Sequence, residues 1–199
     1  MLDTLRGYFF PRRIRRTADL RRFVSGEASY VAQRSTYEFV RNTLAWFGQS
    51  AFADKTFNEA FAICRWEAFA HIAADMTVIV RHHLDVGQAL DPALVHLYAD
   101  MLAEYPHPAH RPDGWSDCHA ALLARLGAQP AERPPDLAAM GRNTGHAIHD
   151  KVPAHSRNLD EERAVLSAAV TFHLISFQDR LPRRLDPAAL AQSLGGAGS

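Results

Sequence analysis

The chain has 199 residues, of which 47% are hydrophobic and 22% charged, a composition typical of one soluble globular domain. Its 22 basic and 22 acidic residues cancel, so no overall field favours nucleic acid or another strongly charged partner. Two cysteines give no sign of a disulfide framework, and we therefore expect a reducing cytoplasm.

Residues 1–16 are expected to form a basic amphipathic arm, separate from the helical domain that follows. Leucines and aromatic residues alternate there with arginines, and such a segment could contact an anionic membrane surface. Alternatively, the aromatic side chains dock on the body of the protein and the arginines are solvated. No secretory signal is expected, because arginines occupy the place of a cleavage site. The basic residues of this prediction are Arg12, Arg13, Arg15 and Arg16.

Two long helices are expected to form an antiparallel hairpin over about 17–48 and 54–85. Thr17 can cap the first helix and Asp54 the second, and apolar residues recur along both at helical spacing. The second helix is apolar on nearly every side, which is typical of a helix surrounded by other helices. Its charged residues would each cost about 3 kcal/mol at the centre of a bilayer, so we do not expect it to span a membrane.

Shorter helices are expected in the C-terminal half, because prolines and capping residues divide that part of the chain. No stretch alternates in the manner of a strand. The prediction is an all-α fold, with one helical-bundle domain over 17–194 built on the long hairpin, and a disordered tail over 195–199. The expected helix boundaries are Asp91-Pro92, Ser116 to Leu126 with Gly127 as its stop, Asp136, Asn158 with Glu161, Pro182, and Asp186-Pro187.

Glu67, His71 and Asp75 are spaced by four residues, so they form one polar stripe along the second long helix. Two carboxylates and an imidazole could bind a metal, but the Glu-x-x-His pattern of di-iron proteins is absent. The favoured interpretation is a buried network in which Glu67 or Asp75 pairs with Arg34 or Arg41 of the first long helix. The predicted members of this network are Gln33, Arg34, Tyr37, Glu38, Arg41, Glu67, His71 and Asp75.

Other residues of catalytic or metal-binding type are expected to have structural roles. A serine-hydrolase elbow is absent, and Ser25 and Ser35 lie in predicted helices with no histidine near them. The remaining residues lack the paired spacing of a zinc site and are assigned to a solvated loop, a polar helix surface or close helix packing. These three groups are His107, His110, Cys118 and His119; His146 and His149; and Gly141 and Gly145.

Two stretches resemble a group of small helical bacterial proteins without established function, some of which carry an esterase label. They are RRFVSGEASYVAQRSTYEFVRN with the helix after it, and KVPAHSRNLDEERAVLSAAVTFHLISFQDRLPRRLDPAAL. The shared motifs are Val31 to Tyr37 (VAQRSTY) and Val152 to His155 (VPAH). The resemblance implies an all-helical fold and ester cleavage. Because the chain lacks recognisable hydrolase residues, no catalytic residue is carried over.

Two functions from different classes remain open at this point. The first is a non-catalytic interaction protein that binds an unidentified protein partner, with Trp46 and Trp115 as contact residues and with residues 1–16 at the cytoplasmic membrane. The alternative is a metal-dependent or hydrolytic enzyme that uses the stripe of Glu67, His71 and Asp75. No cofactor and no nucleic-acid partner is predicted.

Overall fold

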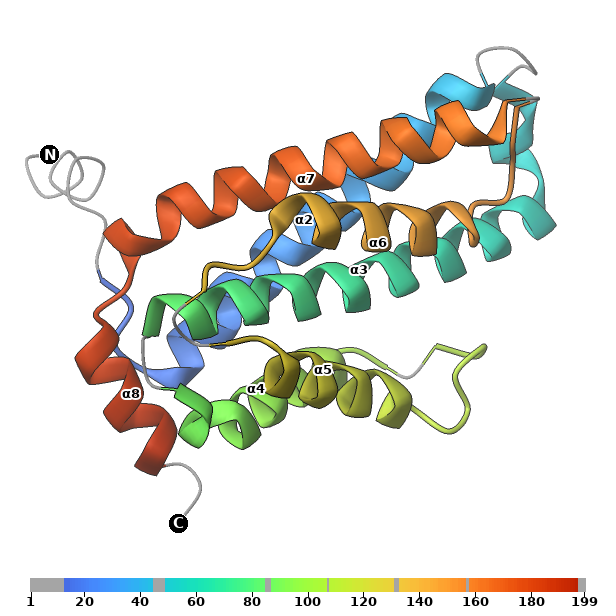
Figure 1. The fold of residues 1–199 in the computed structure, drawn as a ribbon. Coiled ribbons are helices and arrows are strands. Elements are labelled where there is room, and N and C mark those ends of the chain that lie inside the picture. Colours follow the sequence, from blue (N-terminus) through green and yellow to red (C-terminus); the bar gives the residue numbers. More distant parts are fainter. Residues whose placement is uncertain are drawn as a thin grey trace, which may run out of the picture.

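Seven α-helices and two short 3₁₀ helices make up the fold of the described residues (Figure 1). The computed structural model describes residues 13–44, 49–84, 87–106, 108–130, 133–156 and 158–196. No strand is present in these ranges, which confirms the all-α prediction. The elements are α2 (Thr17–Leu44), η1 (Gln49–Ala53), α3 (Lys55–Leu84), η2 (Gly87–Leu90), α4 (Asp91–Ala103), α5 (Ser116–Ala128), α6 (Leu137–His149), α7 (Leu159–Arg184) and α8 (Pro187–Gly196).

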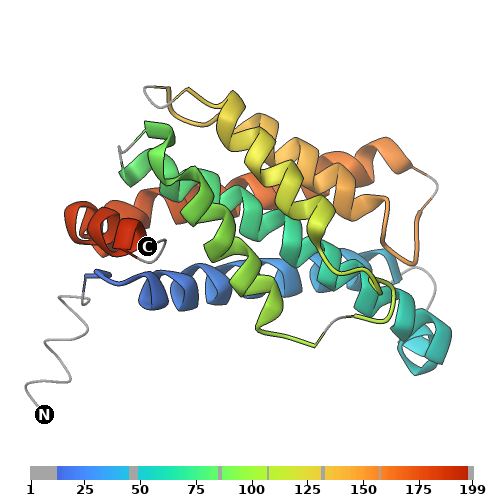
Figure 2. The same ribbon diagram turned by 90° about the horizontal axis from the view of Figure 1, so that it is seen from below.

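Helix α3 runs through the middle of the molecule and contacts every other α-helix. Its buried side chains lie on all sides, with Ile72, Met76 and Ile79 among the most deeply buried. Helix α2 lies antiparallel to it, so the predicted hairpin is present (Figure 1). Helices α6 and α7 cover one side of α3, and α4 and α5 cover the opposite side (Figure 2). A helix apolar all round therefore occupies the position that its sequence predicts.

Capping residues fix the starts of α3, α6, α7 and α8 where the sequence predicts them, whereas Thr17 lies inside α2 and its hydroxyl lies 3.0 Å from Ser193 Oγ. Asp54 accepts a hydrogen bond from the backbone amide three residues later at 2.7 Å, and Asp136 does the same at 2.9 Å. Asn158 and Glu161 bond reciprocally, since the Asn158 side chain accepts from the Glu161 amide and donates to its carboxylate. Asp186 accepts from the Ala189 amide at the start of α8. These bonds satisfy amides that have no partner within their helices.

Three other predicted boundaries are wrong. Asp91 lies in the first turn of α4 instead of capping it, because its carboxylate accepts from Arg81 Nε at 2.8 Å. Gly127 lies inside α5, which continues to Ala128. Helix α7 continues past Pro182, because a proline near a helix end removes few backbone bonds and the amide after Arg184 still bonds to Leu181.

The described end of the N-terminal arm is attached to the junction of α7 and α8. Ile14 is buried, its amide donates to the Arg184 carbonyl, and its carbonyl accepts from the Asp186 amide. Arg15 also pairs with Asp186 at 3.0 Å. Arg13 and Arg16 are exposed; Arg12 and the rest of the arm lie outside the described residues, as do 197–199 of the predicted tail. None of the described helices is long and apolar enough to cross a membrane.

Helices α6 and α7 approach each other closely through two glycines. A Cβ atom at Gly145 would lie 2.6 Å from Ser167 Cα, and one at Gly141 would lie 2.8 Å from Thr171 Cα. Real side chains do not tolerate such distances to backbone atoms. The prediction that Gly141 and Gly145 serve close packing is confirmed, and the contact fixes how the two helices are joined.

We expect Gly145→Ala to lower the free energy of unfolding by about 1–3 kcal/mol, because the added methyl group forces the backbones of α6 and α7 apart. Gly26→Ala is the matched control: no atom lies within 4 Å of its Cβ position, so the better helix former should raise stability by up to about 1 kcal/mol. Urea unfolding of both variants tests this, and equal effects would contradict the close contact.

Candidate functional site

The polar stripe of α3 is neutralised by residues near α5. Glu67 accepts hydrogen bonds from Arg111 Nε at 2.8 Å and Nη2 at 2.6 Å, and His110 Nε2 lies 2.8 Å from the same carboxylate. Asp75 is bound by Arg125 and by the Thr144 hydroxyl. Both carboxylates are therefore buried and paired, as a charged group in a protein interior requires.

The predicted pairing of this stripe with Arg34 or Arg41 is wrong. Arg34 lies on the exposed face of α2, where its Nε is 3.0 Å from Glu38 and its Nη1 donates to Tyr30. Arg41 is also exposed. The stripe faces α5 and α6, whereas these arginines face solvent, because α2 covers another side of α3 (Figure 2).

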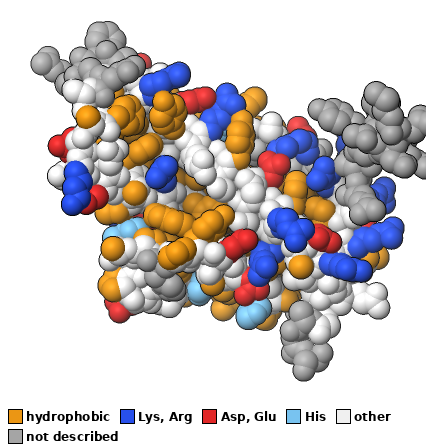
Figure 3. Space-filling model, turned by 180° about the vertical axis from the view of Figure 1, so that it is seen from behind, with side chains coloured by type: hydrophobic (Ala, Val, Ile, Leu, Met, Phe, Trp, Pro, Cys, Tyr) orange, Lys and Arg blue, Asp and Glu red, His pale blue; other side chains and the backbone are white. Residues whose placement is uncertain are grey.

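The predicted network is therefore two separate groups. Glu67, His71 and Asp75 lie on the buried stripe, and burial lowers the pKa of His71, which favours its neutral form. The α2 residues instead line a shallow hollow of about 330 Å³ beside Arg65, on a surface where hydrophobic and charged side chains are mixed (Figure 3). Those that line it are Gln33, Arg34, Tyr37 and Glu38.

A larger groove of about 680 Å³ lies between α2 and α7. Its size falls in the range of small-molecule sites. It contains carboxylates, amides and hydroxyls beside an apolar floor, and no lysine or arginine of the described residues lines it. The residues that line it are Ser35, Glu38, Phe39, Asn42, Thr43, Ser156, Asn158, Glu161, Glu162, Val165, Leu166, Ala169 and His173.

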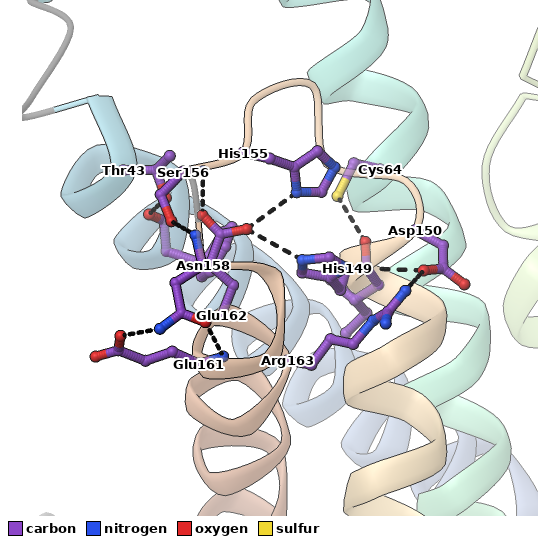
Figure 4. Close-up of polar contacts among 12 residues, drawn as sticks. Thr43, Cys64, His149, Asp150, His155, Ser156, Asn158, Glu161, Glu162 and Arg163 are labelled. Carbon is purple, nitrogen blue, oxygen red and sulfur yellow. Dashed lines mark hydrogen bonds and ion pairs between the residues drawn. The ribbon is translucent and has the colours of Figure 1, made fainter.

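Glu162 joins this groove to a cluster with two histidines (Figure 4). His149 Nε2 and His155 Nδ1 each lie 3.1 Å from Glu162 Oε2, and the Ser156 amide donates to Glu162 Oε1. One ligand atom from each of the three side chains lies within 4.8 Å of the other two. Among the described residues, this is the one group of three such side chains with that spacing.

The chain builds this cluster from the end of one helix, a short connection and the start of the next. His149 is the last residue of α6, and Glu162 lies in the first turn of α7, four residues after the cap Asn158. His155 comes from the connection between them, which Val152 anchors in the core. The close contact of α6 with α7 therefore brings both ends of the cluster together.

Hydrogen bonds keep Glu162 in its charged form. Burial alone would raise the pKa of Glu162, but bonds from Ser156, His155 and His149 offset it and hold the pKa below its ordinary value. His149 is only 2% exposed, and its Nδ1 has no hydrogen-bond partner. That atom lies 3.7 Å from Asp150 Oδ1. Because Nε2 faces a carboxylate oxygen, the ring donates from Nε2, and Nδ1 is left as a buried atom without a hydrogen-bond partner.

The structure places several other predicted residues differently. The prediction that His149 lies on a polar surface is wrong, because α7 and Phe39 cover this side chain. The prediction that His146 lies on the surface is confirmed, since His146 is exposed. Trp115, expected as a surface contact, is buried with Arg111 stacked 4.5 Å from its ring. Trp46 lies outside the described residues.

The loop before α5, which was predicted to be solvated, is bound in part to the body of the protein. His107 lies outside the described residues, and His110 binds Glu67. Burial raises the pKa of Cys118 to about 11 and that of Cys64 to about 12, so both thiols are protonated and poor nucleophiles. His119, whose pKa burial lowers, does not join a three-ligand group among the described residues.

Ser35, expected to have no histidine nearby, shares the groove with His173 of α7. Its Oγ is buried and has no hydrogen-bond partner, so it does not form a nucleophile–base pair with that ring. Ser25 is buried and bonds to Glu104 at 3.4 Å. Neither of these two serines therefore belongs to a catalytic triad.

No protein-family model, no curated protein and no solved structure matches this chain. The function is therefore inferred from the chemistry of the groove and of its cluster.

Glu67 should contribute to stability mainly above acidic pH. Burial would raise its pKa, but bonds from Arg111 and His110 hold the pKa below its ordinary value. The contribution is then complete above the unfolded pKa of about 4.3 and is lost as the pH falls through the lower folded value. We expect Glu67→Gln to cost about 2–4 kcal/mol at pH 7 and progressively less below about pH 4.

Urea unfolding of wild type and variant across this pH range measures the difference. Glu59→Gln is the control, since Glu59 lies on an exposed face of α3 and should change stability by less than about 0.5 kcal/mol. A constant cost of Glu67→Gln at every pH would contradict the ionic role of Glu67.

Proposed function

We propose that the protein is a metal-dependent hydrolase, in which His149, His155 and Glu162 hold a zinc-like divalent ion at the wall of the α2–α7 groove. The observation that carries this proposal is the 3.1 Å approach of two imidazole nitrogens to one carboxylate oxygen. Two histidines and one glutamate are also the ligands of a known class of catalytic zinc site.

The distances suit an ion in place of the present hydrogen bonds. A tetrahedral ion about 2.0–2.1 Å from nitrogen and oxygen ligands holds those ligands about 3.3 Å apart. The two measured separations are close to that value, so small side-chain shifts would admit the ion. The charged carboxylate of Glu162 is already in the state that a metal ligand requires.

The unsatisfied Nδ1 atom of His149 also supports a metal. An ion on Nε2 would move the ring proton to Nδ1, which faces the carboxylate of Asp150. Histidines that bind metals usually donate their second ring N–H to such a carboxylate or carbonyl. Metal binding would thereby give a buried orphan atom a partner.

Three protein ligands leave one position of a tetrahedral ion for water, whose pKa zinc lowers to about 7. Such a site would supply a hydroxide nucleophile for adding water across an acyl C–O or C–N bond in the groove, with one proton of the water passing to the leaving group. His155 is half-exposed, so one side of the cluster is reachable from solvent.

A cytoplasmic location belongs to the same proposal. Cys64 and Cys118 are both free thiols, which suits a reducing compartment. The hypothesis that residues 1–16 contact the membrane rests mainly on residues outside the described ranges, and stays a prediction.

We expect the purified protein to bind one zinc ion, and we expect Glu162→Gln and His155→Ala each to weaken binding about 10-fold or more. Equilibrium dialysis of the EDTA-treated protein against zinc measures both quantities. The zinc-loaded protein should hydrolyse p-nitrophenyl butyrate, and the same variants should lose that activity.

Glu67→Gln is the matched control, because it removes a buried carboxylate of the stripe without touching the cluster. It should keep zinc binding at one equivalent. Zinc binding that is equally strong in wild type, Glu162→Gln and His155→Ala would contradict the proposed site. Failure of every preparation to bind zinc would contradict it as well.

A second candidate function is protein binding, because α7 exposes a row of large apolar side chains. Val165, Phe172 and Ile175 are 53%, 66% and 44% exposed and lie on one helical face. A second copy of the chain is the simplest partner, since a twofold interface needs only one such patch.

Sedimentation velocity tests this candidate. Wild type should form a dimer as its concentration rises, and Phe172→Ser with Ile175→Ser should remain a monomer. A wild-type monomer at all concentrations would remove self-association as a function of this row.

A further inference from the structure

The groove is long enough to hold an extended ligand that reaches away from the metal cluster. Its α7 wall runs from Glu162 to His173, which is about 16 Å along a helix at 1.5 Å per residue. Helices α2 and α7 are antiparallel, so Thr43 lies near Glu162, whereas Ser35 and Glu38 lie toward His173 (Figure 1). The groove therefore has a cluster end and a far end.

The middle of the groove is apolar. Phe39 from α2 and Val165, Leu166 and Ala169 from α7 line it between the two polar ends. A hydrocarbon portion of a ligand would be favoured there, at about 25 cal/mol for each Å² of apolar surface that it buries.

The far end presents three groups able to accept hydrogen bonds. Ser35 Oγ is buried and has no partner, so its lone pairs are unused. Glu38 supplies a carboxylate, of which Arg34 contacts Oε1. Burial, and then the nearby charge of Arg34, lower the pKa of His173, so its neutral ring can offer a bare nitrogen.

Charge favours a cation over an anion in this groove. Among the residues that the structure describes, three glutamates line it and neither lysine nor arginine does so. Arg34, which does not line the groove, offsets part of the negative charge of Glu38. Glu161 forms no ion pair among the described residues. An anionic group at the far end would be repelled by the Glu38 carboxylate, which can only accept hydrogen bonds.

We propose that the far end, formed by Ser35, Glu38 and His173, binds the protonated primary amine of an extended and partly apolar substrate. An ammonium group has three N–H donors, which match the three acceptors. The inference rests on the proposed function and deepens it, since it names the substrate class of the same groove: an ester or amide that carries a primary amine beyond a hydrocarbon spacer long enough to span the groove. The binding step itself does not require the metal.

Calorimetric titration of the EDTA-treated protein tests the far end alone, with three probes of equal chain length: hexylamine, hexan-1-ol and hexanoate. Hexylamine, protonated at pH 7, should bind at least about 10-fold more tightly than either other probe, since hydrogen bonds to a charged donor are the strong ones. Equal binding of the three probes, or preference for hexanoate, would overturn the proposal.

Two variants locate the amine. Glu38→Gln should weaken hexylamine about threefold to 10-fold and leave hexan-1-ol unchanged, whereas the exposed control Glu59→Gln should change neither. Ser35→Ala should also weaken hexylamine without lowering the free energy of unfolding, because it removes a hydroxyl that has no partner. Unchanged hexylamine binding in both variants would overturn the assignment.

Zinc dialysis separates this inference from the proposed function. Amine preference without zinc binding would retain the far-end site and contradict the metal site. Zinc binding without amine preference would do the reverse.

Discussion

The contact of α6 with α7 through Gly141 and Gly145 is the constraint on which the candidate site depends. Because these two glycines have no side chain, the helix backbones approach so closely that the end of α6 lies beside the first turn of α7. His149 and Glu162 meet through that register, and the connection between the two helices carries His155. Close packing at Gly141 and Gly145 therefore determines where the side chains of His149 and Glu162 lie.

The sequence predicts the helices well because their signals are local. The side chains of Asp54, Asp136, Asn158 and Asp186 bond to amides within three residues, so the cap and its partner lie in one short segment. The burial of α3 is also a local signal, since apolar residues on every side of a helix require neighbours on every side. Pro182 shows the limit of such signals, because its effect depends on how many helical bonds follow it.

The partners of buried charges could not be predicted in the same way. Spacing places Glu67 and Asp75 on one face of α3, but it does not say which helix covers that face. Arg34 and Arg41 lie on the preceding helix, yet the face is covered by Arg111 and Arg125, which follow α3 in the chain. The cluster was missed for a related reason: its three residues are separated by six and seven positions across a helix end, a connection and a helix start. No regular period describes that path.

The cluster of His149, His155 and Glu162 must satisfy two requirements: hydrogen-bond donors for Glu162 without an ion, and free ligand atoms for an ion. In the absence of an ion, Glu162 needs donors, and His149, His155 and the Ser156 amide supply them. An ion on the same atoms would take the place of the ring protons at His149 Nε2 and His155 Nδ1, and each proton would move to the other nitrogen of its ring. The bond from Ser156 uses Oε1 and leaves Oε2 to the histidines, so one oxygen can keep the carboxylate in place while the other exchanges two hydrogen bonds for a metal. An arrangement that is stable without the ion is thus already oriented to receive it.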